Sequence, residues 1–279
     1  MKRFHEMPLY FLQKGVEEST CDGHYALVHL YEKSEEYFQH TLNTLKKGRE
    51  VILDNSLFEL GEAFALDDYL NWIERIVENT PKEFISNLTV IAPDSWNNLQ
   101  ESKDAIVPFR RELNKKQLPV RIMAVCQGTT YAELLDCFLW YRIIGIEYIG
   151  INFASQAYGE TLLDKVQGRQ TFICDMLAPY LRETTIKLHL LGCSLPHEFE
   201  LYKYYENMFQ SIESMDTSCP VMHALENTIL GVDKLPKGYK PSLKIDEVFF
   251  KQNFSDVQER NVKLNCQFFE DLCNSVSPS

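Results

Sequence analysis

The sequence is poor in glycine, proline and basic residues, and it has no long apolar run. Only 12 of its 279 residues are glycine and 11 are proline, while 45% are hydrophobic, which excludes a collagen-like chain and a disordered one. No run approaches the roughly 18 apolar residues of a membrane helix, and residues 1–15 lack the apolar centre and cleavage site of a signal peptide. We therefore expect a cytoplasmic protein with no membrane partner.

Cysteine motifs and positive charge are also missing. The eight cysteines form no C-x-x-C motif and no short Cys/His cluster, which argues against a disulfide framework and a structural zinc site. We predict free, mostly buried thiols, no metal and no cofactor. The 28 Lys and Arg residues are outnumbered by 40 Asp and Glu residues, so that the net charge is −12. This charge disfavours a protein that coats nucleic acid, and a nucleic-acid enzyme would need a local basic patch.

Short apolar runs rich in β-branched residues alternate with longer segments of helical period along almost the whole chain. The predicted strands cover residues 25–31, 51–53, 88–92, 120–126, 148–151, 186–191, 210–215 and 243–250. Helices are predicted from Ser34 to Gly48, over 66–79, from Leu99 with a kink or break at Pro108, from a Thr130–Glu133 capping box, over 162–181, and after Pro196, Pro220 and Ser255. This order is typical of an α/β protein.

Seven or eight strand–helix units without a Pro-, Gly- or Ser-rich linker predict an α/β fold with one TIM-like (β/α)8 barrel and a C-terminal helix. Residues 1–279 then form a single domain. The competing architecture is an open, doubly wound sheet. That fold normally has a Gly-rich phosphate-binding turn after its first strand, whereas the first predicted strand here runs into Glu32-Lys33-Ser34.

Polar residues follow the predicted strands, where a barrel of this kind has its active site. These strand-end residues are Asp54, Asp94, Gln127, Gly128, Asn152, Gly192 and Asp216. An Asp after a strand often only caps the next helix, but the same residue type follows three separate strands here. His189 lies inside an apolar strand and is more typical of a buried, hydrogen-bonded histidine than of a catalyst. Carboxylates without a Cys/His cluster fit acid–base or nucleophilic chemistry at an anomeric carbon.

Five segments of the chain resemble motifs of the tRNA-guanine transglycosylase superfamily. They are residues 52–59 with that family's D-S-G-G-F-Q segment, Ala92-Pro93-Asp94 with a base-reading strand end, residues 125–128 with V-Q-G-G, residues 189–196 with L-x-G-x-G-x-P, and residues 215–220 with F-D-C-V-x-P. The family consists of barrels that exchange nucleobases through a covalent aspartyl–sugar intermediate. The resemblance implies that Asp216 attacks C1′, that Asp94 binds the base edge and that Asp54 is the general acid/base. Gln127, Gly128, Asn152 and Gly192 would complete the substrate pocket.

The chain also departs from that family. It lacks the C-terminal cysteine-rich zinc site, the later glycines of D-S-G-G, the second glycine of Q-G-G and the arginine that follows the proline. These differences point to small relatives that act on DNA, so the expected function is cleavage of an N-glycosidic bond in nucleic acid, DNA rather than tRNA, by a glycosylase or a base-exchange enzyme. Base exchange in tRNA, a small-molecule nucleosidase and an inactive binding barrel are the alternatives. A base would have to leave the stack to reach the barrel.

A lysine-rich loop offers the positive charge that a nucleic-acid enzyme needs. Lys234, Lys237, Lys240 and Lys244 lie within eleven residues of one another, after the Asp216 strand and its helix. We predict that this loop binds the phosphate backbone. The alternative is an ordinary solvated loop, because lysine-rich surface loops are common.

Overall fold

The computed structural model describes residues 1–279 except 182–184, 197, 203–209, 237 and 277–279. None of the helices in these described segments is long and apolar enough to cross a membrane. All eight cysteines are buried and have free thiols.

Eight parallel strands form one sheet in the order β1-β8-β7-β6-β5-β4-β3-β2, and helices connect them. The strands are β1 (Lys2–Phe4), β2 (Gly23–Leu27), β3 (Glu50–Asp54), β4 (Leu88–Ile91), β5 (Arg121–Cys126), β6 (Tyr148–Asn152), β7 (Lys187–Leu191) and β8 (Ile212–Asp216). The last helix, α14 (Asp256–Val276), follows the final strand. The chain is a TIM-like (β/α)8 barrel with a C-terminal helix, which confirms the predicted fold class.

The chain divides into two compact units. Unit 1 consists of Met1–Asp22, Ile151–Ala154 and Tyr158–Ser279, and unit 2 consists of Gly23–Gly150 and Ser155–Ala157. The single domain expected for residues 1–279 stays a prediction.

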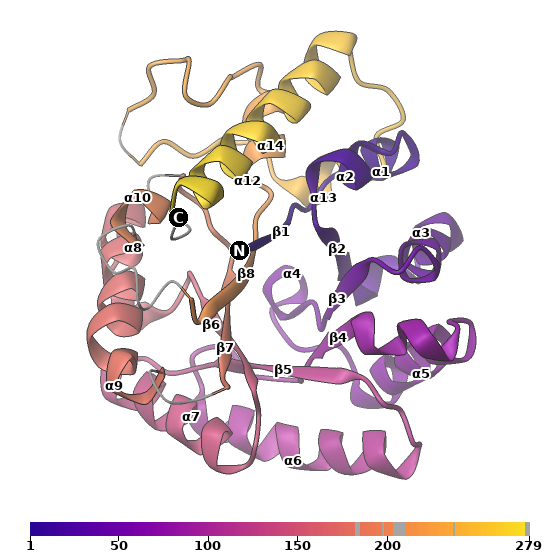
Figure 1. Cartoon of the computed structure of the whole chain (residues 1–279), viewed down its shortest axis with the longest axis vertical. Coiled ribbons are helices and arrows are strands. Elements are labelled where there is room, and N and C mark those ends of the chain that lie inside the picture. The colour runs from indigo at the N-terminus through magenta and orange to yellow at the C-terminus, as the bar shows by residue number, and fades with distance from the viewer. Residues whose placement is uncertain (182–184, 197, 203–209, 237, 277–279) are drawn as a thin grey trace. The chain divides into compact units, whose positions relative to one another are not determined.

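Unit 2 contains the parallel strands β2, β3, β4 and β5, each paired with the next (Figure 1). Its helices are α3 (Glu35–Lys46), α4 (Leu57–Leu60), α5 (Leu66–Glu78), α6 (Leu99–Lys115) and α7 (Tyr131–Ile143). The predicted cap of α3 is confirmed, because the Ser34 hydroxyl accepts a hydrogen bond from the Tyr37 N–H at 3.2 Å. Helix α5 buries Tyr69, Leu70 and Ile73 on one face, so its helical apolar period positions it against the sheet.

Unit 1 contains β1, β7 and β8, and β8 lies between the other two. Its helices are α1 (Leu9–Gln13), α2 (Val16–Thr20), α8 (Leu162–Thr171), α9 (Ala178–Leu181), α10 (Glu198–Tyr202), α12 (Cys219–Leu225), α13 (Ile245–Val248) and α14, and a π-helical segment, Phe172–Leu177, joins α8 to α9. Helix α14 packs along α12 (Figure 1). As predicted, Ser255 and Gln258 cap it: each side chain accepts the other residue's backbone N–H.

The eighth predicted strand is wrong. Residues 243–250 contain the short helix α13 instead, and the remaining strand is β1 at the N-terminus, which pairs with β8 from Lys2 to Phe4. A three-residue strand with two adjacent cations has no apolar run or alternation to reveal it. Its place in the sheet depends on pairing with a strand more than 200 residues away in the sequence.

Three local predictions also need correction. The first predicted strand, 25–31, is a strand only to Leu27, and Val28–Leu30 form a 3₁₀ turn. The prediction failed because both segments are buried, and an apolar run alone does not distinguish a strand from a turn. Helix α6 runs from Leu99 to Lys115 without a break at Pro108. The capping box before α7 is only half formed: Thr130 accepts the Glu133 N–H, but the Glu133 carboxylate binds Thr129.

Candidate functional site

Asp94 is the most constrained carboxyl group at the strand ends of unit 2. It lies three residues beyond β4 and is 7% exposed. Asn55 Nδ2 donates to its Oδ1 at 2.7 Å, and Gln127 Nε2 donates to its Oδ2 at 2.7 Å. Burial raises the pKa of Asp94 from 3.8 to about 6, although the hydrogen bonds from Gln127 and Asn55 oppose this rise. The carboxyl group therefore changes its protonation state near neutral pH.

The two amides that hold Asp94 are themselves held. Asn55 Nδ2 also donates to the carbonyl of Ala92 at 2.8 Å, and Gln127 Oε1 accepts the Asn97 N–H at 3.0 Å. Asn55 and Gln127 are 2% and 1% exposed. Because each amide is oriented by a second bond, their donors face the Asp94 carboxylate in a fixed geometry.

Asp54, at the end of β3, accepts hydrogen bonds from a side chain and from the backbone. The Tyr25 hydroxyl donates to Oδ2 at 2.5 Å, and the Ser56 N–H donates to Oδ1 at 2.5 Å. The helix predicted after Asp54 covers 66–79, but the short helix α4 already begins at Leu57, and the carboxylate fixes the turn before it. Ser56 has a φ of 61°, a left-handed conformation that non-glycine residues adopt at a cost. Asp54 therefore has a structural role whatever its chemistry.

Two exposed aromatic side chains lie on the segments that follow β3 and β4. Phe58, in helix α4, is 69% exposed, Trp96 is 37% exposed, and their ring centroids are 5.8 Å apart. Asp54 ends β3, and Asp94 lies on the same segment as Trp96. The strand ends of unit 2 thus present a half-buried and a buried acid together with an apolar surface, a combination that is common in small-molecule sites.

Gly128 has a packing requirement of its own. A Cβ atom there would lie 2.7 Å from the Cβ of Glu133 and 3.1 Å from the backbone nitrogen of Leu134. The Ser155 hydroxyl donates to the Gly128 carbonyl at 3.1 Å. The close approach of α7 explains why glycine occupies this position, and its role in substrate binding stays a prediction.

In unit 1, Asp216 lies at the end of β8 and is 3% exposed. Its Oδ1 is 2.9 Å from His189 Nε2, and the Gly192 N–H donates to both carboxylate oxygens at 3.1 and 3.2 Å. The other imidazole nitrogen, Nδ1, is 2.5 Å from the Ser214 hydroxyl. His189 is fully buried and hydrogen-bonded, as predicted.

The row Ser214–His189–Asp216 contains the residue types of a hydrolase triad, but its orientation is reversed. In such a triad the serine faces the substrate and the aspartate supports the histidine from behind. Here Ser214 and His189 are completely buried and only Asp216 has any exposed surface. The row therefore positions Asp216 and does not activate a serine.

A buried ion pair supports the turn that carries Gly192. Arg169 and Glu198 have side chains with no exposed surface and a shortest N–O distance of 2.6 Å. Arg169 also donates to the carbonyls of Ile151 at 3.1 Å and Leu191 at 2.6 Å, which ties the ends of β6 and β7 together. No local sequence pattern reveals this pair, because its two partners are 29 residues apart and only the fold brings them together.

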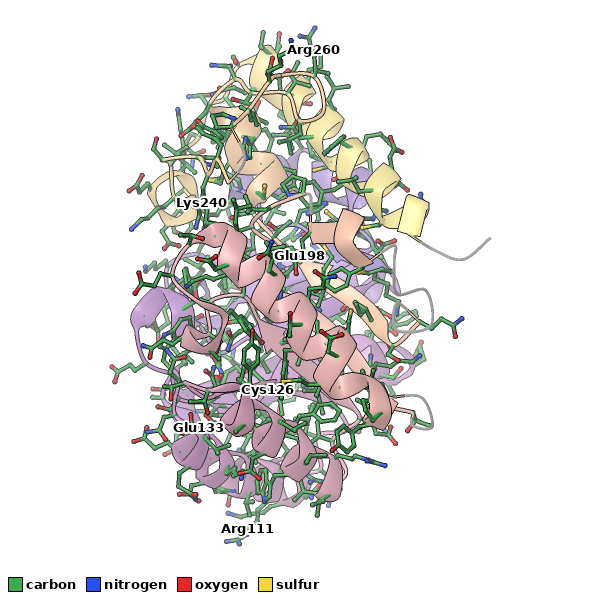
Figure 2. The ribbon with its side chains drawn as sticks, turned by 90° about the vertical axis from the view of Figure 1, so that its left-hand side faces the viewer. Arg111, Cys126, Glu133, Glu198, Lys240 and Arg260 are labelled. Atoms are coloured by element: carbon green, nitrogen blue, oxygen red, sulfur yellow. The ribbon has the colours of Figure 1, made fainter. Side chains whose placement is uncertain are left out.

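The remaining predicted residues lie at separate places in unit 1. Asn152 ends β6 and is 8% exposed. Lys234, Lys240 and Lys244 are exposed on the segment between α12 and α13, and Lys240 is labelled in Figure 2. Lys237 lies outside the described residues. Phosphate binding by these lysines stays a prediction.

No protein-family model and no curated protein matches this sequence. Several solved structures resemble the fold. A proposed fructose-1,6-biphosphate aldolase from Coccidioides immitis is 10% identical, with a TM-score of 0.52, over 98% of this chain and 91% of that one. A methylaspartate ammonia lyase variant from Clostridium tetanomorphum is 11% identical, with a TM-score of 0.49, over 99% of this chain. The dihydrodipicolinate synthase of Agrobacterium tumefaciens is 9% identical, with a TM-score of 0.48, over 96% and 97%.

This chain spans 59% of the length of the ammonia lyase that it matches. At these identities the likeness establishes the fold, which is one that known enzymes have.

The comparison contradicts the predicted cleavage of an N-glycosidic bond in nucleic acid. A solved structure that matches with a TM-score above 0.5 is an aldolase and not a glycosylase or a transglycosylase. The physical reason is that the matched motifs are short strand ends with structural explanations here: Asp54 fixes a turn and Gly128 admits a helix. The resemblance to the transglycosylase superfamily and the nucleic-acid partner stay predictions.

Proposed function

We propose that this protein is an enzyme that transfers protons to and from a small-molecule substrate, with Asp94 as its general acid/base. The observation that carries the proposal is the Asp94 carboxyl group at a strand end, held between two amide donors, with a pKa raised to about 6 by burial. A general acid/base works best when its pKa lies near the working pH. Raised pKa values of this kind cluster at functional sites.

Asp54 supplies a second acidic group on the neighbouring strand of unit 2. Strands β3 and β4 are paired in register from Val51 with Leu88 onward, so Asp54 and Asp94 both follow the carboxyl ends of adjacent strands. Asp54 is half-buried and holds the Tyr25 hydroxyl at 2.5 Å. A phenol and a carboxylate in this contact can pass a proton between them. Two proton-transfer groups allow removal of a proton at one atom and its return at another.

The chemistry rests on carboxylates and not on a lysine Schiff base. Among the described residues, no lysine stands at the carboxyl end of a strand; Lys2 and Lys187 open their strands instead. A Schiff-base enzyme needs an amine at the site. A small substrate fits the net charge of −12, which repels a polyanion, and it fits the small-molecule enzyme named among the structures that share this fold.

The test is hydrogen exchange in deuterated water. The protein is incubated with a panel of 2-oxo acids, hydroxy ketones and sugar phosphates, and incorporation of deuterium beside the carbonyl group is followed by NMR. We expect one class to exchange, and we expect Asp94→Asn to slow that exchange by about 10²–10⁴-fold. The matched control is Asp104→Asn, at an exposed aspartate of α6, which should exchange at the wild-type rate.

A titration of the Asp94 carboxyl carbon by NMR tests the same proposal without a substrate. A pKa near 6 supports it. A pKa at the ordinary aspartate value, or wild-type exchange in Asp94→Asn, would refute the assignment of Asp94.

A further inference from the structure

Asp216 is a buried carboxylate that has no lysine or arginine partner among the described residues. Among the described residues, no lysine or arginine nitrogen lies within the 4.0 Å of an ion pair, and the only ionisable contact is His189 at 2.9 Å. The Asp216 side chain is 4% exposed. A charge buried in this way normally has a partner of opposite sign, because removal from water is costly.

The buried ionisable groups around this strand end offer Asp216 no lysine or arginine partner among the described residues. The Arg169 guanidinium and the Glu198 carboxylate neutralise each other in a fully buried pair. His189 contacts the Ser214 hydroxyl through Nδ1 and the Asp216 carboxylate through Nε2. Among the described buried groups on β7, β8, α8 and α10, no lysine or arginine therefore remains to pair with Asp216.

The hydrogen bonds of Asp216 leave one oxygen under-used. Oδ1 contacts both His189 Nε2 and the Gly192 N–H, whereas Oδ2 has, among the described residues, only the longer contact with the Gly192 N–H, at 3.2 Å. A carboxylate oxygen can accept about two hydrogen bonds. Gly192 has a φ of 69°, which a side chain would strain, so glycine lets this N–H point at the carboxylate. The structure thus fixes Asp216 and leaves acceptor capacity on Oδ2.

We propose that Asp216 binds the ammonium group of a small-molecule ligand. The ammonium supplies the missing positive charge and donates a hydrogen bond to Oδ2, and a charge-assisted bond of this type is short and strong. His189, Ser214 and Gly192 are the positioning residues of the site, since they contact Asp216 and not the ligand. This site does not depend on the proposed proton-transfer function, which uses Asp94 in unit 2.

The experiment compares amines with alcohols of the same shape. Wild-type protein labelled with ¹³C and ¹⁵N is titrated near neutral pH with ethanolamine and putrescine, and separately with ethylene glycol and 1,4-butanediol. The signals followed are the Asp216 carboxyl carbon and the Gly192 amide. We expect saturable shifts with at least one amine and at least about tenfold weaker binding of the matching alcohol.

Two variants complete the test. Asp216→Asn keeps the size of the side chain and removes its charge, so it should weaken amine binding by about tenfold or more. Asp104→Asn, at an exposed aspartate of α6, is the control and should bind amines as the wild type does. Equal shifts with alcohols, unchanged amine binding in Asp216→Asn, or no saturable shift with either amine would each overturn the proposal. The wild-type titration decides even if Asp216→Asn fails to fold.

Discussion

Asp94→Asn is expected to change how the free energy of unfolding depends on pH. Burial raises the pKa of Asp94 from its ordinary value of 3.8 to about 6. A change of one in pKa corresponds to about 1.4 kcal/mol. Ionising Asp94 therefore costs about 3 kcal/mol more in the folded protein than in the unfolded chain. Asparagine cannot ionise, so the variant lacks this cost.

The sign follows from proton binding in the two states. Between pH 3.8 and about 6 the folded protein holds the Asp94 proton while the unfolded chain has lost it. The free energy of unfolding therefore falls as the pH rises through this window. Below it the penalty is absent, and above it the penalty is complete. Asparagine also places its amide NH2 group opposite the NH2 donor of Asn55 or Gln127. The loss of that hydrogen bond lowers the free energy of unfolding by the same amount at every pH.

The assay is urea unfolding of the wild type and of Asp94→Asn at several pH values from 4 to 8. We expect the variant to gain about 2.5 kcal/mol relative to the wild type between the two ends of this range, because a small part of the penalty is already present at pH 4. Asp104→Asn, at an exposed aspartate, is the control and should run parallel to the wild type. If the Asp94→Asn and wild-type curves are also parallel, Asp94 does not have a raised pKa and the reasoning fails.

Three further changes test the packing around the strand ends, each by urea unfolding at neutral pH. Tyr25→Phe removes the donor 2.5 Å from Asp54 and should cost about 1–2 kcal/mol; no loss would show that the hydroxyl does not hold the carboxylate. Gly128→Ala places a Cβ atom 2.7 Å from a side-chain carbon of α7 and should cost about 1–3 kcal/mol. Arg169→Met leaves the fully buried Glu198 carboxylate without its partner and should lower the free energy of unfolding by about 3–5 kcal/mol. The double variant Arg169→Met/Glu198→Leu should restore much of this loss; a double variant as unstable as the single one would contradict this account.

The sequence predicted most strands because their signal is local. Leu88–Ile91, Arg121–Cys126 and Tyr148–Asn152 are apolar runs bounded by turn residues, and each is a strand within one residue of the predicted limits. Strand β1 was not predicted, because only its pairing with β8 makes Lys2–Phe4 a strand. The error over 243–250 has the same origin: a run of apolar and charged residues fits a helix or a strand until packing selects one.

The candidate site was accessible from the sequence to a similar extent. Parallel strands predict that Asp54, Asp94 and Asp216 follow strand ends, and the structure places all three there. The sequence could not show what each carboxylate touches. The contact of Tyr25 with Asp54 joins residues 29 positions apart, and that of Gln127 with Asp94 joins residues 33 positions apart. Such contacts depend on the register between strands and on side-chain directions, which no local pattern encodes.

Asp94 and Asp216 show how surroundings give one residue type two different tasks. Asp94 is held by side-chain amides, and burial raises its pKa until it can exchange a proton near neutral pH. Asp216 is held by a backbone N–H and an imidazole, and no lysine or arginine among the described residues pairs with it. The first environment suits a carboxyl group that changes its protonation state, and the second suits a carboxylate that binds a positively charged group. An exchange of these roles would require Asp94→Asn to abolish amine binding while Asp216→Asn abolished proton transfer.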